Sequence, residues 1–264
     1  MDCYYYKEFK LNNGSLDPSV DCTYVLIMHK SPREKQIFQQ VINHKLTTHV
    51  VFQYNLGFKN CNKNLKGNWA NFDLEHAVKN IFKHALDRGY KRILVLEDDC
   101  EFDERIKDPN VIHDLNTFLN KENPSVYNLG TVYRVISPIH ILLNSNHKLL
   151  LWFTGAHACI YNEKYMKYGI KHEFLLNHAD LEPFRHFSKY TYKIPLAYQK
   201  LPDTINTKRD HGLDKLTKEI FIKPYNLDKQ TQPGYSLMHK VFDCCSINGC
   251  LVLIILILLI SNLL

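Results

Sequence analysis

The sequence contains no Cys-x-x-Cys spacing, no internal repeat and no low-complexity tract. The missing Cys-x-x-Cys pairs exclude a zinc ribbon and argue against a tight disulfide framework. We therefore expect the scattered cysteines to be mostly reduced, as in a cytosolic protein; they include Cys3, Cys22, Cys61, Cys100 and Cys159. Basic residues are not gathered in one stretch with interleaved aromatics, which argues against nucleic-acid binding although the net charge is +6.

The chain does have enough apolar residues for a full core, because 45% of its 264 residues are hydrophobic. A chain of this length buries about three quarters of its unfolded surface, so it needs no disulfide staple. One sizeable domain or two small ones is expected.

A long apolar run closes the sequence, from Ile247 to Leu264. In a helix, ~18 residues span about 27 Å, which is just enough for a bilayer core. With no apolar amino-terminal segment resembling a signal peptide, the run predicts a tail anchor with the main domain in the cytosol. A buried core helix is the alternative. Asn13-Gly14-Ser15 fits a glycosylation sequon, which a cytosolic domain would not use.

Apolar periodicity predicts alternating strands and helices. The expected strands are 24–28, 49–54, 93–96, 125–129 and 149–153, with an extended segment at 191–198. The expected helices are 31–44, 72–88, 109–119 and 163–168, the first opening at Ser31 and the second ending at Gly89. This order predicts an α/β domain, a mostly parallel, Rossmann-like sheet flanked by helices. Residues 1–20 are expected to be a loosely ordered entry, 21–207 the domain, 208–243 a strap and 244–264 the membrane anchor.

Three adjacent carboxylates, Glu97, Asp98 and Asp99, follow the aliphatic strand 93–96. Ligands of open α/β sheets bind outside the carboxyl ends of the strands, where these acids are expected. Carboxylate oxygens favour Mg²⁺, Mn²⁺ or Ca²⁺ over zinc. We expect Glu97 and Asp99 to face the same way and to hold a cation that bridges two phosphates. The alternative is an acidic helix-capping turn.

A second group of polar residues comes later, with Asp180 and Glu182 at its centre. Either carboxylate is a candidate for taking a proton from an attacking hydroxyl. In a second interpretation His178, Asp180 and His186 are metal ligands. In a third, Asp180 caps the start of a helix.

Small residues surround a histidine in Thr154-Gly155-Ala156-His157-Ala158. They suggest backbone packed closely against a ligand, although small residues also allow tight internal packing. Arg33 and Arg134 are candidates for phosphate contacts, but lone arginines usually lie on solvated faces.

Taken in order, these segments resemble glycosyltransferase family 25, which includes lipopolysaccharide-type and collagen-type galactosyltransferases. The resemblance covers roughly residues 24–205. It rests on Ala85 to Tyr90, Ile93 to Asp99 with Phe102, Tyr127 to Gly130, Thr154 to Tyr161, His178 to Leu181 and Ile194 to Gln199. His29 to Arg33 lies where the family places an Asn-Leu followed by an arginine. The apolar carboxyl-terminal run is no part of the family's usual pattern. Small enzymes of this kind occur in large DNA viruses, a source that the Asn- and Lys-rich composition would suit.

The resemblance implies a GT-A fold and a metal-dependent, inverting transfer of a hexose from a nucleotide sugar, such as a UDP-hexose, to a glycan or protein acceptor. It implies Mn²⁺ or Mg²⁺ at Glu97 and Asp99, and Asp180 with Glu182 as catalytic carboxylates. The residues implied to bind the donor are Arg33, Asp98, Gly155, His157 and Gln199. Two other functions stay open: a membrane-tethered metal-dependent phosphohydrolase, and a non-catalytic relative that binds a glycan or a partner.

Overall fold

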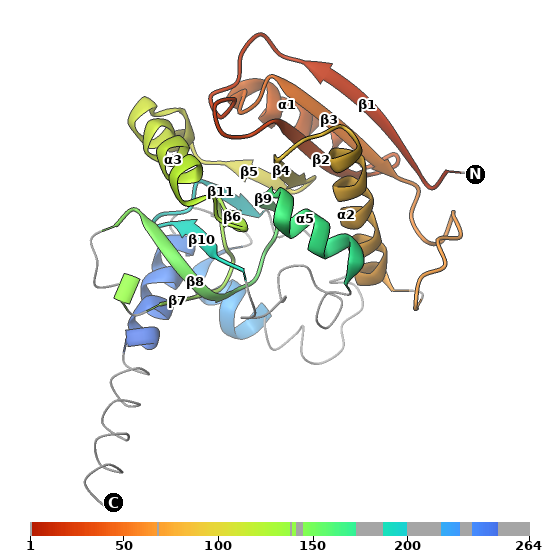
Figure 1. Cartoon of the computed structure of the whole chain (residues 1–264). Helices are drawn as coiled ribbons and strands as arrows, with labels where there is room; N and C mark the ends of the chain where they lie inside the picture. The colour runs from red at the N-terminus through yellow and green to blue at the C-terminus, as the bar shows by residue number, and fades with distance from the viewer. Residues whose placement is uncertain are drawn as a thin grey trace, which may run out of the picture.

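Nine strands form one twisted sheet in the computed structural model, with helices on both faces (Figure 1). The structure describes residues 2–67, 69–137, 139–140, 145–172, 187–199, 218–227 and 234–247. Within these ranges the strand order is β1-β3-β2-β4-β9-β6-β10-β8-β7, and β11 and β5 pair separately.

The amino-terminal half is a doubly wound α/β unit, as predicted. It consists of β2 (Cys22–Met28), α1 (Glu34–His44), β3 (His49–Asn55), α2 (Ala70–Asp87) and β4 (Arg92–Glu97). Strand β2 pairs in parallel with β3 on one side and with β4 on the other. The chain therefore winds outward from β2 to β3 and then returns to β4. This reversal makes the carboxyl ends of β2 and β4 a topological switch point, the position at which open α/β sheets bind their ligands, and we refer to this position as the crevice.

The other half of the sheet is mixed. Strand β9 (Ala158–Asn162) lies antiparallel between β4 and β6 (Val126–Asn128). Next come β10 (Lys189–Tyr192), β8 (His147–Phe153) and β7 (Arg134–Ile136). Among the described neighbours of the large sheet three pairs are parallel and five antiparallel. The α/β class is confirmed, and the sheet is more mixed than the mostly parallel one expected, because β1, β8 and β9 run against the other strands.

Alternate residues of the strands fill two cores, one on each face of the sheet. Leu94 and Leu96 of β4 pack with α1 and with α3 (Pro109–Glu122). Ile93 and Val95 of the same strand pack with α2 and with α5 (Glu163–Lys171). A strand buried on both faces needs an unbroken aliphatic run, which the sequence of β4 supplies.

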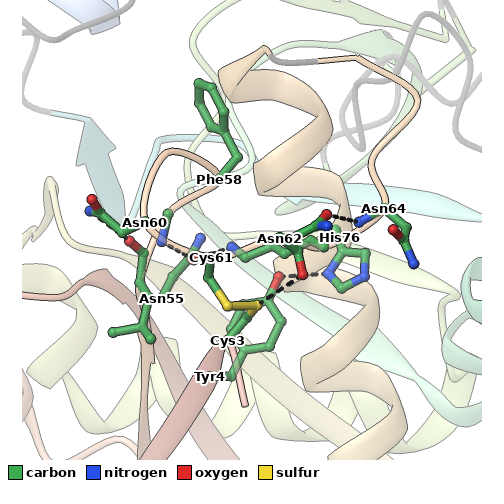
Figure 2. Close-up of a disulfide and its surroundings, with 12 residues drawn as sticks. Cys3, Tyr4, Asn55, Phe58, Asn60, Cys61, Asn62, Asn64 and His76 are labelled. Atoms are coloured by element: carbon green, nitrogen blue, oxygen red, sulfur yellow. Dashed lines mark hydrogen bonds between the residues drawn. A yellow bond between two sulfur atoms is a disulfide. The ribbon is translucent and has the colours of Figure 1, made fainter. Parts of the chain in front are cut away.

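The first residues of the chain form an edge strand, β1 (Tyr4–Lys10), where the sequence suggested a loose entry. It pairs antiparallel with β3, from Tyr4 opposite Asn55 to Lys10 opposite His49. Directly before it, Cys3 forms a disulfide with Cys61 in the loop that follows β3 (Figure 2). The expectation of reduced cysteines is therefore wrong for this pair. The other described cysteines form no disulfide with a described residue: Cys22, Cys100 and Cys159 are buried, and Cys244 and Cys245 are exposed.

The predicted strap contains structure that packs on the domain. Short turns, η3 (Lys218–Ile222) and η4 (Lys223–Tyr225), precede a helix over residues 234–247 (blue in Figure 1). Leu227, Tyr235 and Met238 share a small core with Val132 and Tyr198. No helix among the described residues is long and apolar enough to cross a bilayer. Residues 248–264, which hold nearly all of the predicted anchor, lie outside the described residues.

Candidate functional site

The crevice between the carboxyl ends of β2 and β4 brings together most of the described residues that the sequence singled out. The turn after β2 carries Ser31 and Arg33, and Asp98 and Asp99 directly follow β4. Strand β11 (Ala197–Gln199) pairs with β5 (Cys100–Phe102) and places Gln199 opposite Cys100, next to Asp99. The predicted position of the acids, at the end of a buried strand, is thus confirmed.

Asp98 bridges the two strands that border the crevice. Its Oδ1 lies 2.6 Å from Nη2 of Arg33, and its Oδ2 accepts a 2.7 Å hydrogen bond from the Ser31 hydroxyl. Ser31 was expected to open the first helix, but α1 begins at Glu34 and the hydroxyl binds Asp98 instead. Asp98 therefore holds Arg33 in place, and both of its oxygens are engaged within the chain.

Asp99 lies deeper, and only one of its two carboxylate oxygens is bonded to a described residue. The side-chain amide of Gln199 donates a 3.1 Å hydrogen bond to Oδ2, whereas Oδ1 is buried and has no hydrogen-bond partner among the described residues. Burial raises the pKa of Asp99 from 3.8 to about 6; the bond from Gln199 and the charge of Arg33 oppose that rise, and the charge of Asp98 adds to it. A buried oxygen without a partner costs about 1–3 kcal/mol. This free energy is recovered if a cation or a proton binds there.

The side chain of Glu97 was expected to face the same way as that of Asp99, but the geometry of β4 directs it elsewhere. It is the last residue of β4, and its N–H donates to the carbonyl of His157 at 2.9 Å. By the pleat of the strand, its side chain follows Val95 onto the face of α2 and α5. Burial raises the pKa of Tyr161 on that face well above its usual value, and the charge of Glu97 adds a small part of that rise. The strand ends at Glu97, so its two-residue alternation does not extend to Asp99.

Two turns, one at Gly130 and one at Gly155, lie beside the acids and are joined by the side chain of Asn128. We refer to these two turns as the wall. The Asn128 amide donates to Gly155 O at 2.7 Å, and its Oδ1 accepts from Gly130 N–H at 2.8 Å. A Cβ at Gly130 would lie 1.7 Å from the carbonyl oxygen of Ala197. Gly155 has φ +86°, and a Cβ there would lie 2.5 Å from Val132. These contacts require glycine at both positions.

His157 lies inside this wall. Its ring is fully buried between Gly130 and Gly155, and neither ring nitrogen has a hydrogen-bond partner of good geometry in the described part of the chain. Burial lowers the pKa of His157 to about 4, with the Ala197 carbonyl opposing the change. The small residues at 154–158 therefore serve packing within the chain in this structure. Gly155 and His157 bound the crevice and support its wall, and direct contact of His157 with a donor would need the wall to open.

The helix over residues 234–247 closes the other side of the wall. Tyr235 is fully buried and donates a 3.4 Å hydrogen bond to the carbonyl of Gln199. His239 Nε2 contacts the carbonyl oxygens of Thr131 and Val132 at 2.9 and 3.2 Å. Arg134, a candidate phosphate ligand in the sequence, is 3% exposed and paired with Asp243 at 2.7 Å. This arginine fastens the helix, so it is not available to a phosphate.

Asp180 and Glu182, the predicted catalytic carboxylates, lie outside the described residues, as do His178 and His186. The described part of the chain has no group of three or more His, Cys, Asp or Glu side chains placed to hold a metal ion. A cation at the crevice would need ligands from a bound molecule or water as well. Mg²⁺ and Mn²⁺ sites of this kind commonly use one or two carboxylates plus substrate phosphates. The unpartnered Oδ1 of Asp99 fits such a site.

The sequence did not assign three residues of the site a role there. Ser31 and Asn128 lie in segments that carry the family resemblance, but Ser31 was interpreted as a helix cap and Asn128 as a strand residue, and Tyr235 as part of a strap. Their roles depend on contacts between positions that are far apart in the chain, such as Ser31 with Asp98 and Tyr235 with Gln199.

No protein-family model and no curated protein matches the sequence. Among solved structures, A197 from STIV is similar with a TM-score of 0.41 and 14% identity, over 68% of this chain and 86% of that one. Mannose-1-phosphate geranyltransferase from Thermus thermophilus has a TM-score of 0.32 and 10% identity, over 64% and 73%. Apo UDP-glucose pyrophosphorylase has a TM-score of 0.33 and 13% identity, over 70% and 79%. These scores and identities are low, so the function is argued from the chain's own residues.

Proposed function

We propose that the chain is a metal-dependent glycosyltransferase that moves a hexose from a nucleotide sugar to a hydroxyl of a glycan or protein acceptor. The observation that carries the proposal is Asp99, a buried carboxylate at the topological switch point with one oxygen left unpartnered. The order of motifs that resembles glycosyltransferase family 25 supports the same assignment.

Asp99 is the residue that fits a divalent cation, Mn²⁺ or Mg²⁺. Glu97, the second carboxylate that the family resemblance implies, would have to turn away from the face of α2 and α5 to share that cation. When bound, such a cation neutralises the charge that develops on a departing nucleoside diphosphate. Gln199 orients Asp99 by binding Oδ2, which leaves Oδ1 for the cation. Ionised Asp99 is required, because a protonated carboxyl group is a poor ligand for a hard cation.

Arg33 is suited to the donor's phosphates. Its Nη2 binds Asp98, while its Nε is buried without a hydrogen-bond partner and its side chain is 30% exposed. A guanidinium fixed by one carboxylate presents its remaining donors in a set direction, which favours recognition of phosphate oxygens. In this assignment Asp98 acts by orienting Arg33. Asp180, with Glu182, stays the predicted base for the acceptor hydroxyl, as the inverting transfer of the family implies.

The donor follows from the same resemblance, and we propose a UDP-hexose. The apolar run that ends the sequence is proposed to tether the enzyme to a membrane, so that acceptors at the membrane surface are within reach.

Purified full-length protein incubated with Mn²⁺ and a panel of nucleotide sugars tests the proposal. We expect release of nucleoside diphosphate together with transfer of the sugar, lost on addition of EDTA and in Asp99→Asn. Glu104→Gln is the matched control, because it also converts a carboxylate to an amide, but at a side chain that is 77% exposed. Release of free phosphate without transfer would indicate the phosphohydrolase. If the protein shows no turnover and Asp99→Asn leaves metal-dependent nucleotide binding unchanged, the assignment of the site is wrong.

A further inference from the structure

Asn13 lies in an exposed, hydrogen-bonded loop after the edge strand β1. Both Asn12 and Asn13 are exposed. The loop is held by its backbone, since Gly14 N–H donates to Asp17 Oδ2 at 2.9 Å and Ser15 N–H donates to the carbonyl of Lys45 at 3.0 Å. The side chain of Asn13 is therefore accessible in the folded domain.

Packing explains only the middle residue of the Asn13-Gly14-Ser15 sequon. A Cβ at Gly14 would lie 2.4 Å from Cα of Thr47, so glycine is required there. The Ser15 hydroxyl, in contrast, is buried and makes no hydrogen bond to any described residue. A buried hydroxyl without a partner costs about 1–3 kcal/mol, so alanine would suit the folded state better. The hydroxyl therefore has no role in the described fold, whereas a glycosylation sequon requires a hydroxyl two residues after its asparagine.

The Cys3–Cys61 disulfide is an independent indication of the same environment (Figure 2). Disulfides form and persist in oxidising compartments such as the lumen of the endoplasmic reticulum, and are rare in the cytosol. Glycosylation sequons are used on secreted and lumenal domains. Each feature alone is a weak argument, but the two share no residue and predict the same compartment.

The position of Asn13 is compatible with the candidate site. Tyr4 at the start of β1 pairs with Asn55 at the carboxyl end of β3, whereas Lys10 pairs with His49 at its amino end. A seven-residue strand spans roughly 20 Å. Asn13 follows Lys10, so it lies at the end of the sheet opposite the acids, and a glycan there leaves the crevice open.

We propose that Asn13 is an N-glycosylation acceptor and that the folded domain lies on the lumenal or extracellular side of its membrane. In the modification, Nδ2 of Asn13 forms a bond to the anomeric carbon of an oligosaccharide carried on a lipid diphosphate. The bond from that carbon to the diphosphate oxygen breaks, the lipid diphosphate leaves, and the amide loses a proton to a base. This proposal is independent of the glycosyltransferase assignment and opposes the cytosolic placement expected from the sequence.

Translation of the full-length chain in the presence of microsomes tests it. We expect a protease-protected domain with one added glycan that an amidase specific for N-linked glycans removes. Asn13→Gln and Ser15→Ala are expected to lose the glycan, and Asn12→Gln, the matched control, to keep it. Ser15→Ala is also expected to unfold no more easily than the unglycosylated parent chain.

Every other outcome overturns the proposal. A domain that protease digests from outside the microsomes, with Cys3 and Cys61 open to alkylation, places it in the cytosol. A protected domain without the glycan shows that Asn13 is not an acceptor. A glycan that persists in Asn13→Gln shows that another residue carries it.

Discussion

Breaking the Cys3–Cys61 disulfide is expected to cost much of the free energy of unfolding while leaving the fold intact. The two cysteines are 58 residues apart. Cross-linking a loop of this length removes chain entropy from the unfolded state, worth about 4 kcal/mol at 25 °C. The free energy of unfolding of native proteins is about 5–15 kcal/mol, so this loss is a large share of the total.

The native contacts around the disulfide explain why the fold should survive. Lys63, two residues after Cys61, binds the carboxylate of Asp73 and the side chain of Asn55. Asp73 also accepts from the N–H of Phe58 at 3.3 Å. These bonds hold the loop against α2 without the cross-link.

Urea unfolding of the purified full-length chain, with and without a reductant, measures the effect. We expect the free energy of unfolding of the oxidised chain to exceed that of the reduced chain, and that of the Cys3→Ser/Cys61→Ser variant, by about 4 kcal/mol. The stability of the variant should not depend on the reductant. Cys245→Ser, at an exposed cysteine outside the disulfide, is the control and should match the parent. A reductant effect below about 1 kcal/mol would refute the reasoning.

Three further changes test other parts of the structure. Burial raises the pKa of Asp99 from 3.8 to about 6, so the ionised carboxylate destabilises the metal-free fold at pH 8. Asp99→Asn should therefore raise the free energy of unfolding by up to about 3 kcal/mol. Thermal unfolding at pH 8 with EDTA measures this, and a loss of stability would contradict it. Burial lowers the pKa of His157 from 6.5 to about 4 and that of His239 to about 3, so both histidines favour the folded state fully above pH 6.5 and less as the pH drops toward 4. The raised pKa of Asp99 acts in the opposite direction, so chemical denaturation is measured in Asp99→Asn, where a flat profile over that window would count against both burials. Asp243→Asn should lower the free energy of unfolding by about 2 kcal/mol, because it leaves the buried Arg134 without its ion-pair partner. Glu219→Gln, in an ion pair whose side chains are about half exposed, should lower it by less than about 1 kcal/mol. Equal losses in urea unfolding would show that the Arg134 pair does not hold the helix on the domain.

The elements with strong periodicity were predicted from the sequence because their patterns are local. The aliphatic run of β4 and the helical spacing of α2, ending at Gly89 with φ +77°, needed no tertiary information. Strand β1 was not predicted, because it is an edge strand with several exposed, charged residues and only Tyr4 buried. Such strands gain their order from the neighbour to which they bond, here β3.

The site was predicted in position but not in detail. The sequence placed the acids at a strand end, yet it did not show that β4 stops at Glu97, that Asp98 turns toward Arg33, or that Asp99 meets Gln199. The disulfide and the docking of the helix over 234–247 join positions 58 and 109 residues apart. Contacts of that separation leave no local pattern, so composition and periodicity could not reveal them.

Titration calorimetry of Mn²⁺ and UDP into the full-length protein shows whether Asp99 holds a cation that the nucleotide needs. We expect UDP to bind more tightly with Mn²⁺ than with EDTA, Asp99→Asn to lose this metal dependence, and Glu104→Gln to keep it. Metal-dependent UDP binding of equal strength in Asp99→Asn and in the parent chain would show that Asp99 is not the metal ligand.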